Sequence, residues 1–336
     1  MSRVAQTPTV RIGNVGAIPA VYKAAGVDIE AALRAVGLSA DAFDDPDAIV
    51  PYKALDELFA FGVRKTNCEH LGLLIGMSTP DLGLPSFLLF NAPSVREGLE
   101  DLISALDRFD SGGAGCLIQT EGVAELGYTV TVPGLKCVDH IHDHAIALGY
   151  ALLARLIGPQ FEPSEIRLPR RQPADVAPYR AFFQKGRIKF DASEAMIEFP
   201  ARYLDLPVVG ADPALYGFLK RMIVKHGPRV DSSIASQIRR VLPGLIRRDP
   251  VNPNAIARMF GMNARTMSRR LAEEQVTLIS LVEEARFEVA RQLLLDTGMG
   301  LTEIAAQLHY SDASAFARAF RRKFGSAPGA WRAEQR

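Results

Sequence analysis

The chain has 336 residues and a formal net charge of +1, and 48% of its residues are hydrophobic. This length predicts two domains, and the hydrophobic content excludes a globally disordered chain. No apolar run reaches the roughly 18 residues that a membrane span requires, and the first ten residues lack the basic and apolar order of a secretory signal.

The cysteines also indicate the cellular compartment. Cys68, Cys116 and Cys137 are far apart in the sequence and odd in number. This pattern favours reduced thiols in a cytoplasmic protein over a disulfide framework or a zinc site. A redox-sensing role for one of the three is left open as an alternative.

The charge of the chain is divided unevenly along its length. Residues 1–220 carry 20 Lys or Arg and 27 Asp or Glu, a net charge of −7. Residues 221–336 carry 19 Lys or Arg and 11 Asp or Glu, a net charge of +8. This asymmetry indicates that the C-terminal part, and not the N-terminal part, binds a polyanion.

The N-terminal two thirds combine helical periodicity with strand-like alternation. The expected helices cover residues 28–38, 95–109 and 140–158, and the expected strands cover residues 116–120, 125–132, 165–169, 186–190 and 195–199. The first two strands should form a hairpin across Glu121 and Gly122, with the second strand half-buried, and residues 195–199 should belong to a second hairpin. The mixture predicts an α+β domain over residues 11–205.

Two short motifs in this domain could be mistaken for functional sites. His140 and His144 stand one helical turn apart in "HIHDH", as two metal ligands on a helix would. No "HExxH" glutamate or third ligand accompanies them, so we expect one packed and one solvated helix face, with the lining of an effector pocket as the alternative. The glycine-rich "GGAG" at residues 112–115 lacks the lysine and hydroxyl residue of a phosphate loop and predicts a turn. No "GxSxG" elbow or carboxylate pair predicts an enzyme.

Residues 206–228 are expected to form a linker region. Their segment "LDLPVVGADPAL" contains two prolines and shows no clear period. Beyond it, strand-like alternation disappears and helical periodicity continues to the end of the chain. Residues 229–336 are therefore expected to form an all-α domain.

This second domain contains an internal repeat. The units "IARMFGMNARTMSRRL" and "IAAQLHYSDASAFARAF" begin at Ile256 and Ile304, and their offset of 48 residues becomes 49 after the turn. Each predicts a short helix, a tight turn and a second helix, over about residues 253–274 and 301–324. The expected N-caps are Asn252, Asn263, Thr302 and Ser311 or Asp312, and Gly261 should end the first helix. This is the helix-turn-helix arrangement, whose second helix enters the DNA major groove.

Each of the two second helices should have one apolar and one polar face, at about 100° per residue. The inward positions are Met267, Leu271, Phe316, Phe320 and Phe324, and the outward positions are Arg265, Arg269, Ser314, Arg318 and Arg322. Arginine suits such a face because its planar fork can bind guanine or a phosphate through two hydrogen bonds. The outward faces are therefore expected to bind DNA.

A single helix should join the two units over residues 278–296. At 1.5 Å per residue its roughly 19 residues span roughly 28 Å. This length is close to the ~34 Å between successive major-groove faces on one side of B-DNA. We therefore expect the two units to enter adjacent major grooves of one duplex.

From about Val230 to Arg332 the chain resembles the AraC/XylS family of bacterial transcription regulators. The segment "LTEIAAQLHYSDASAFARAFRRKFGSAP" is close to the signature of that family, although His309 replaces a glycine often found at the turn. The resemblance implies base contacts from Arg265, Ser268 and Arg269 in the first unit, base contacts from Ala313, Ser314, Ala317 and Arg318 in the second, and phosphate contacts from Arg321, Arg322 and Lys323. Because alanine makes no hydrogen bond to a base, the second unit should depend more on phosphates.

Residues 169–215 are similar to the ligand-binding domain of one branch of this family, which implies an effector-binding or dimerising domain. The expected partners are double-stranded promoter DNA, a small-molecule effector, a second copy of the chain and, for an activator, RNA polymerase. No cofactor, metal or membrane is expected, and the protein should lie in the cytoplasm with the nucleoid. Two alternatives are a metal-dependent enzyme domain fused to a DNA-binding module and an architectural DNA binder without an effector.

Overall fold

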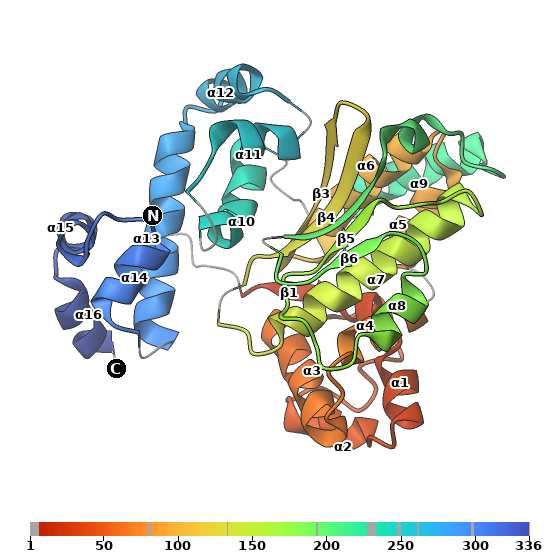
Figure 1. Ribbon diagram of the computed structural model, residues 1–336, viewed down its shortest axis with the longest axis horizontal. Coiled ribbons are helices and arrows are strands. Elements are labelled where there is room, and N and C mark those ends of the chain that lie inside the picture. The colour runs from red at the N-terminus through yellow and green to blue at the C-terminus, as the bar shows by residue number, and fades with distance from the viewer. Residues whose placement is uncertain are drawn as a thin grey trace. The chain divides into compact units, whose positions relative to one another are not determined.

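The computed structural model describes residues 7–79, 82–132, 134–192, 194–226, 233–246, 250–260, 262–296 and 299–335. The chain divides into two compact units, Met1–Val230 and Asp231–Arg336. The first unit combines helices with two sheets, and the described residues of the second form helices joined by turns (Figure 1). The predicted order of an α+β domain followed by an all-α domain with two helix-turn-helix units is confirmed.

A five-stranded sheet organises the first unit. Its strand order is β3-β4-β7-β5-β6, and every neighbouring pair is antiparallel except β5 and β6. The strands are β3 Gly113–Thr120, β4 Val123–Val130, β5 Glu165–Arg167, β6 Arg187–Lys189 and β7 Ala195–Pro200. Thr120 lies opposite Val123, and Gly122 has a φ of 76° in the turn between them. The predicted first hairpin is therefore confirmed, since glycine adopts positive φ without strain.

The second predicted hairpin is wrong. Strand β7 lies between β4 and β5, where Ile197 is opposite both Leu126 and Ile166. Its Met196, Ile197 and Phe199 are buried, because β7 is a central strand with neighbours on both edges. A hairpin at the edge of the sheet would have left such a strand half exposed. Strand β6 instead pairs in parallel with β5.

Two local expectations about β3 and β4 also differ from the structure. Thr129, on the polar side of the alternation in β4, is 8% exposed, although it pairs only with Ala114 of β3 and lies one residue beyond the pairing of β4 with β7. Gly113 and Gly115 belong to β3 and not to a turn. A Cβ on Gly113 would lie 1.8 Å from Tyr128 Oη, so a neighbouring aromatic side chain, and not a turn, requires this glycine.

Helices and a two-stranded sheet complete the first unit (Figure 1). The helices are α1 Ile18–Ala24, α2 Ile29–Ala35, α3 Tyr52–Thr66, α4 Leu71–Ser78, α5 Leu84–Asn91, α6 Val95–Phe109, α7 Val138–Ile157, α8 Ala177–Phe182 and α9 Pro213–His226. Strands β1 Thr9–Arg11 and β2 Ile49–Pro51 are antiparallel, and the 3-10 helices η1 Ile12–Val15 and η2 Ala201–Asp205 follow β1 and β7. The predicted helices at residues 95–109 and 140–158 correspond to α6 and α7.

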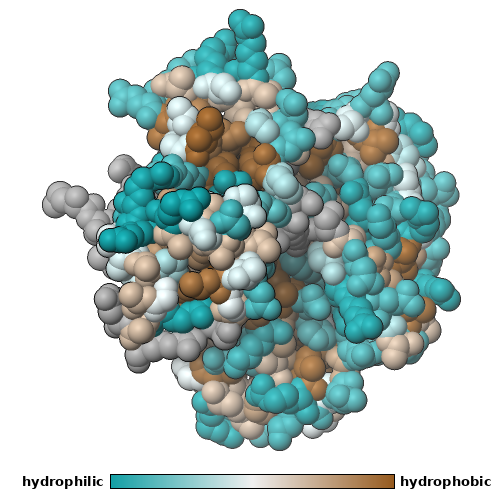
Figure 2. All heavy atoms as spheres, turned by 60° about the vertical axis from the view of Figure 1, so that its left-hand side comes forward, coloured by the Kyte–Doolittle hydropathy of each residue, from teal (hydrophilic) through white to brown (hydrophobic). Residues whose placement is uncertain are grey.

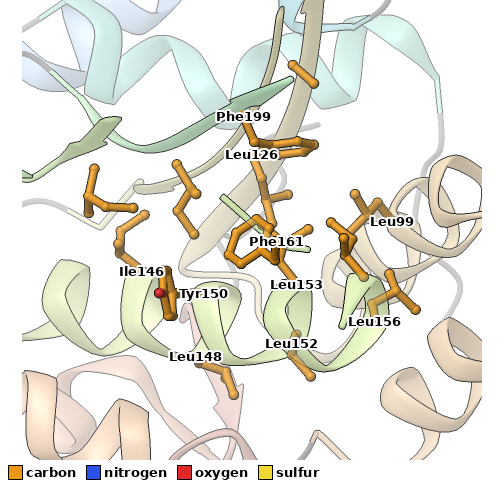
Figure 3. Close-up of a cluster of buried hydrophobic side chains, with 14 of the residues drawn as sticks. Leu99, Leu126, Ile146, Leu148, Tyr150, Leu152, Leu153, Leu156, Phe161 and Phe199 are labelled. Atoms are coloured by element: carbon orange, nitrogen blue, oxygen red, sulfur yellow. The ribbon is translucent and has the colours of Figure 1, made fainter. Parts of the chain in front are cut away.

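Helix α7 belongs to both hydrophobic clusters of this unit. Its Leu153 packs in a cluster with the sheet, whereas Ile141 packs in a second cluster with α1 and α3. Figure 3 shows Leu153 directed toward Leu126 and Phe161, with Leu148 and Leu152 on the other side of the helix. Helix α4 approaches α7 closely, since a Cβ on Gly72 would lie 2.1 Å from the His140 carbonyl oxygen.

The residues predicted as a linker include a packed helix. Within residues 206–228, α9 buries Leu219 and Ile223 against Leu88 of α5 and Ala105 of α6. Only 8% of Leu219 and 6% of Ile223 is exposed. This part of the predicted linker therefore lies in the first compact unit.

The second unit is built around a central helix. Its helices are α10 Ile234–Ile246, α11 Pro253–Met259, α12 Ala264–Glu273, α13 Leu278–Asp296, α14 Leu301–Gln307, α15 Ala313–Phe324 and α16 Pro328–Gln335. Figure 1 shows α12 near one end of α13, with α14, α15 and α16 along its other part. The bounds of α13 agree with the predicted joining helix.

The ends of the four helix-turn-helix helices follow local capping chemistry. Asn252, Asn263 and Asp312 each accept hydrogen bonds from main-chain N–H groups in the next turn, as predicted. The expected cap at Thr302 is wrong, because the N-cap is Gly300, two residues earlier, where Glu303 Oε2 accepts from Gly300 N at 2.9 Å. The predicted terminator Gly261 lies outside the described residues.

The repeat is also visible in main-chain hydrogen bonds. Met262 N donates to Ala257 O at 3.0 Å, and the equivalent Tyr310 N donates to Ala305 O at 2.9 Å. Such bonds close a helix whose next residue is left-handed. In the second unit that residue is His309, with a φ of 58°. The turn therefore has the geometry that glycine favours, although the sequence places a histidine there.

We expect His309→Gly to raise the free energy of unfolding of the protein. In this left-handed backbone region a residue with a Cβ lowers the stability of the fold by roughly 1 kcal/mol, whereas glycine has no such cost. Urea unfolding of the wild-type protein and of the His309→Gly and His309→Ala variants measures the effect. His309→Ala is the control because it removes the imidazole and keeps the Cβ. A glycine variant no more stable than the alanine variant would contradict this account of the turn.

Candidate nucleic-acid interface and an internal cavity

Helix α12 has one buried and one exposed face, as the sequence predicts. Met267 is 0% exposed and Leu271 is 1% exposed. Arg265, Ser268 and Arg269 are exposed on the other side of the helix. The structure therefore places all three predicted base-reading side chains of the first unit on one accessible face.

Helix α15 repeats this division. Phe316 and Phe320 are fully buried, and Phe324 is partly buried beside Trp331, with ring centroids 6.3 Å apart. The remaining predicted contact residues lie toward solvent: Ser314, Arg318, Arg321, Arg322 and Lys323 are exposed, and Ala313 and Ala317 are partly exposed. The aromatic stripe thus fixes the helix to the core and leaves its basic side free.

The N-terminal end of α15 is fixed by its cap. Asp312 Oδ1 accepts from Ala315 N at 2.7 Å, and Ser311 Oγ donates to Asp312 Oδ2 at 3.1 Å. These hydrogen bonds lower the pKa of the Asp312 carboxyl. The cap therefore stays ionised at neutral pH and sets where the helix that carries Ser314 and Arg318 begins.

Few of the exposed cations on these helices are held by acidic partners. Arg269 lies 3.8 Å from Glu273, and Arg322 lies 3.7 Å from Glu283 on α13. Such exposed pairs contribute at most about 1 kcal/mol and are easily exchanged for a phosphate. Arg265, Arg318 and Arg321 form no ion pair with any described residue. The basic faces are therefore available to an external anion.

The surface around these helices is predominantly hydrophilic. Ile279 is the single exposed large hydrophobic residue among the described residues of the second unit. On the face drawn in Figure 2, apolar side chains form separate patches between hydrophilic ones. This surface suits contact with a charged, hydrated partner such as a nucleic acid better than burial in an apolar interface.

Both helix-turn-helix units are joined firmly to their neighbouring helices. Glu274, at the end of α12, accepts from Ile234 N and Ala235 N at 2.9 Å each and so caps α10. At the other end, Arg332 of α16 donates to Leu294 O at 3.0 Å, and Phe324 packs on Phe287 of α13. The joining helix therefore holds the two recognition helices at a fixed separation within this unit.

The "HIHDH" motif is buried on all sides, so the expected solvated face is wrong. His140, His142, Asp143 and His144 are each at most 8% exposed. His140 Nδ1 accepts from Gly72 N at 3.3 Å, and the His140 ring stacks on Phe59. Helix α7 passes between α3, α4 and the sheet, so even its polar side chains are covered.

Asp143 belongs to a buried polar network and not to a metal site. Arg170 Nη1 forms an ion pair with Asp143 Oδ2 and donates to Glu69 O, and Tyr179 Oη donates to Asp143 Oδ2 at 2.6 Å. Within the described ranges, no group of three or more His, Cys, Asp or Glu side chains could hold a metal ion. The motif therefore gives the metal-dependent enzyme alternative no structural support.

The cysteines show no features of a reactive thiol. Burial raises the pKa of Cys116 to about 12 and that of Cys137 to about 11, and it also raises the pKa of the half-buried Cys68. A thiolate, the form that reacts with oxidants, is therefore disfavoured at all three positions. The redox-sensing alternative gains no support.

The part of the chain that the structure describes also contains no helix long and apolar enough to cross a membrane.

A cavity of about 90 Å³ lies inside the first unit, where its two hydrophobic clusters meet. Its walls come from β1, η1, α3, α6, α7, β3, β4 and β7. The lining is almost entirely apolar and includes Val15, Leu55, Leu102, Leu106, Leu126, Ile141, Leu148, Leu152 and Ile197. Sequence reasoning did not find this site, because its members are scattered from Val10 to Ile197. Two of its lining residues drew attention in the sequence: His144, as a candidate residue of an effector pocket, and Gly115, as part of a predicted turn.

One wall of the cavity is closed by a polar network. Tyr128 Oη donates to Asp110 Oδ2 at 2.5 Å, and the hydroxyls of Tyr128 and Tyr52 are 2.9 Å apart. Asp110 Oδ1 accepts from Gly112 N at 3.0 Å and Gly113 N at 2.9 Å. Burial raises the pKa of both tyrosines well above the usual range, so they stay neutral.

Two family matches cover most of the chain. Residues 26–208 match the family described as the arabinose-binding domain of AraC transcription regulator, N-terminal. Residues 256–334 match a helix-turn-helix domain family. The first match spans more than half of the chain, and the second includes both recognition helices.

Several relatives are transcription regulators. The chain is 26% identical to the HTH-type transcriptional regulator VirS of Mycobacterium tuberculosis over 279 residues, which covers 81% of this chain and 78% of VirS. It is 21% identical to the ornithine utilization regulator of Pseudomonas aeruginosa, with 91% of each chain covered. A crystal structure of the transcriptional regulator CdpR from Pseudomonas aeruginosa is 21% identical, with a TM-score of 0.43 over 90% of this chain and 95% of CdpR.

We expect the protein to lose stability as the pH falls from about 6.5 to 4. Burial lowers the pKa of His140 and of His144 to about 4. In this interval the two histidines therefore bind more protons in the unfolded chain than in the folded one, and each lowers the free energy of unfolding by roughly 3 kcal/mol by the lower limit. Asp143, whose pKa burial raises to about 6, opposes them and offsets only part of this loss. Urea unfolding at several pH values measures the slope, which should be shallower in His140→Gln. His70→Gln, at a partly exposed position, is the control, and equal slopes in wild type and His140→Gln would contradict the assignment.

Proposed function

The chain belongs to the AraC family of transcription regulators, and from this premise we propose how its two recognition helices bind promoter DNA. Helices α12 and α15 enter adjacent major grooves of one duplex, and α13 sets the distance between them. The observation that carries this proposal is the repeated division of each helix into a buried apolar stripe and an exposed basic face. Helix α13, with its 19 residues, has a length suitable for placing the two recognition helices in adjacent major grooves.

The contact residues divide into two kinds. Base edges are read by Arg265, Ser268 and Arg269 of α12 and by Ala313, Ser314, Ala317 and Arg318 of α15. Phosphates are bound by Arg321, Arg322 and Lys323 at the end of α15. This division follows the accessible positions, since residues in the first turns of a recognition helix reach base edges and those further along reach the backbone.

We assign residues 11–205 together with helix α9 to effector binding and dimerisation, the rest of residues 206–228 to the connection, and residues 229–336 to DNA binding. In this proposal α9 completes the surface of the effector domain before the chain crosses to the DNA-binding domain. The effector acts by shifting the population between DNA-competent and DNA-incompetent arrangements. The protein binds its operator as a homodimer in the cytoplasm and, as an activator, contacts RNA polymerase.

The internal cavity favours an effector-responsive regulator over an architectural DNA binder. A close-packed domain whose role is to hold DNA has no need of an apolar cavity lined from eight elements, because such space costs stability. Selection of duplexes from a random DNA pool by the full-length protein tests the whole proposal. Enrichment of a site with two sequence blocks one helical turn apart supports it, and binding without enrichment contradicts it.

We expect Arg269→Ala to remove sequence preference at one base pair. A lost two-hydrogen-bond contact to guanine costs about 1–3 kcal/mol in discrimination. Arg269→Lys is the matched control, because it keeps the charge but lacks the planar fork. Arg269→Lys should lose the same base preference as Arg269→Ala, while the dependence of its affinity on salt stays as in wild type. Competition binding with operator duplexes changed at single positions measures both, and an unchanged preference in Arg269→Ala would remove this residue from the base readers.

We expect Arg322→Ala to weaken binding to all sequences by a similar factor. Loss of one phosphate contact reduces the slope of log affinity against log salt by about one. Arg239→Ala serves as control, since Arg239 is an exposed arginine of α10 that pairs with Glu284 at 3.3 Å and lies on neither recognition helix. Binding titrations at two salt concentrations distinguish the variants. Equal slopes for Arg322→Ala and wild type would show that this arginine does not contact phosphate.

A further inference from the structure

Two polar atoms on the wall of the cavity lack partners. Asn14 of η1 is 7% exposed, His144 of α7 is 6% exposed, and both line the cavity. Among the residues that the structure describes, neither Asn14 Oδ1 nor His144 Nδ1 has a hydrogen-bond partner. Burying such atoms alone costs free energy, which a matching group on a ligand would recover. The pair therefore marks the polar end of a binding site.

The chemistry of this pair selects the group that would bind it. An amide oxygen accepts a hydrogen bond, whereas a neutral imidazole has one nitrogen that donates and one that accepts. Burial lowers the pKa of His144 to about 4, so its ring is neutral at neutral pH, and the ring also contacts the main chain of Asn14. The two unpaired atoms thus belong to residues that contact each other and both line the cavity. A hydroxyl group matches both atoms when Nδ1 carries the ring proton, because it then accepts from His144 Nδ1 and donates to Asn14 Oδ1.

The rest of the lining excludes charged ligands. No Lys or Arg is found among the described residues that surround the cavity, so an anion would be buried without a counter-charge. The carboxylate of Asp110 already accepts from Gly112 N, Gly113 N and Tyr128 Oη. It therefore stabilises the wall of the cavity, and its negative charge further disfavours an anion. Because it already accepts three hydrogen bonds, it compensates poorly for the lost hydration of a cation in this otherwise aliphatic site.

The lining also excludes a sugar. Apart from the two unpaired atoms and the network of Asp110 and the tyrosines, the walls are aliphatic. A polyol would place several hydroxyl groups against leucine, isoleucine and valine side chains, and each would lose its hydrogen bonds to water. The name of the matching domain family therefore does not describe the chemistry of this cavity.

The volume of the cavity limits the size of the ligand. One water-sized group needs about 10–15 Å³ of such space, so a cavity of about 90 Å³ accommodates roughly six to nine groups. A six-membered ring with a short substituent has this size. The apolar lining on α7 extends along the helix from Ile141 to Leu152, which is consistent with a ring placed alongside the helix.

We infer that the cavity binds a small, neutral, mostly apolar alcohol, with its hydroxyl group between Asn14 and His144 and its hydrocarbon part against α6, α7 and the sheet. The lining residues Ile146, Leu148 and Leu152 of α7 and Leu126 of β4 are labelled in Figure 3. A bound ligand contacts both hydrophobic clusters and so stabilises their junction. Its role as the effector rests on the proposed function, whereas binding itself does not.

Binding of matched probes to the full-length protein tests the ligand class. Benzyl alcohol and cyclohexanol should raise the melting temperature and give saturable heats in titration calorimetry, because a ligand of the folded state stabilises it. Toluene, which lacks the hydroxyl, should bind about tenfold more weakly, as expected for one lost hydrogen bond. Benzoate, benzylamine and L-arabinose should cause no shift. Binding of benzoate or benzylamine as tight as that of benzyl alcohol, or no binding of either alcohol, would overturn the inference.

A cavity-filling variant tests the location. A Cβ on Gly149 would lie 3.4 Å from Ile197 Cδ1 and 3.7 Å from Leu126 Cδ2, both of which line the cavity. Gly149→Ala therefore fits without a clash and should weaken benzyl alcohol at least tenfold, while the protein without ligand melts no lower than wild type. Gly217→Ala on α9 is the matched control, since it makes the same helix substitution away from the cavity. Unchanged affinity in Gly149→Ala would place the ligand elsewhere.

A second pair of variants tests the polar end. Asn14→Leu and His144→Phe each remove one unpaired atom and keep the site apolar, so each should lower the preference for benzyl alcohol over toluene toward unity. The preference is a ratio within one folded variant, so a general loss of stability does not produce it. An intact preference in both variants would overturn the assignment of these residues.

Duplex selection carried out separately keeps this inference distinct from the proposed function. Sequence-specific DNA binding together with no probe binding would contradict the ligand class and leave the regulator assignment standing. Probe binding lost in Gly149→Ala together with no selected duplex would support the ligand site and contradict the proposed mode of DNA binding. A selected operator whose affinity changes with benzyl alcohol, and not in Gly149→Ala, supports both.

Discussion

The burial of one stripe of each recognition helix is the constraint on which DNA binding by this protein depends. Met267 and Leu271 in α12, and Phe316 and Phe320 in α15, are at most 1% exposed. Because a helix turns about 100° per residue, fixing these positions inside also fixes which residues face outward. The arginines reach solvent as a consequence of apolar packing, and their own electrostatics contribute little to where they lie.

The first unit is governed by a different constraint, the insertion of α7 between two hydrophobic clusters. The helix is long enough to contact both, and its histidines are buried because neighbouring elements approach it closely at Gly72 and Gly76. The clusters do not fill the space at their junction, where the cavity with Asn14 and His144 lies. The same arrangement therefore buries the histidines on which the expected acid sensitivity depends and leaves the space that we assign to a ligand.

The two units illustrate which features of a fold can be predicted from a single sequence. The helix-turn-helix units were predictable because they are encoded locally: caps such as Asn263 and Asp312 act within one turn, and the apolar stripes repeat at helical spacing. The bounds of α13 agree with prediction for the same reason. Predictions failed where distant segments decide the outcome, as for the pairing of β7 with β4 and for Gly113, whose position in a strand depends on Tyr128 across the hairpin.

The sequence by itself determined the domain order, the repeat, the recognition helices and the exposed basic residues, since each follows from local periodicity, from capping, or from a direct match between two segments of the sequence. The tertiary structure alone decided the order of strands in the sheet, the burial of the "HIHDH" motif and the existence of the cavity. Its walls combine residues as far apart as Val10 and Ile197, and the loss of partners at Asn14 and His144 arises where they meet. Packing between remote segments has no local signal, because hydrophobic burial is non-directional and does not specify which apolar surfaces pair.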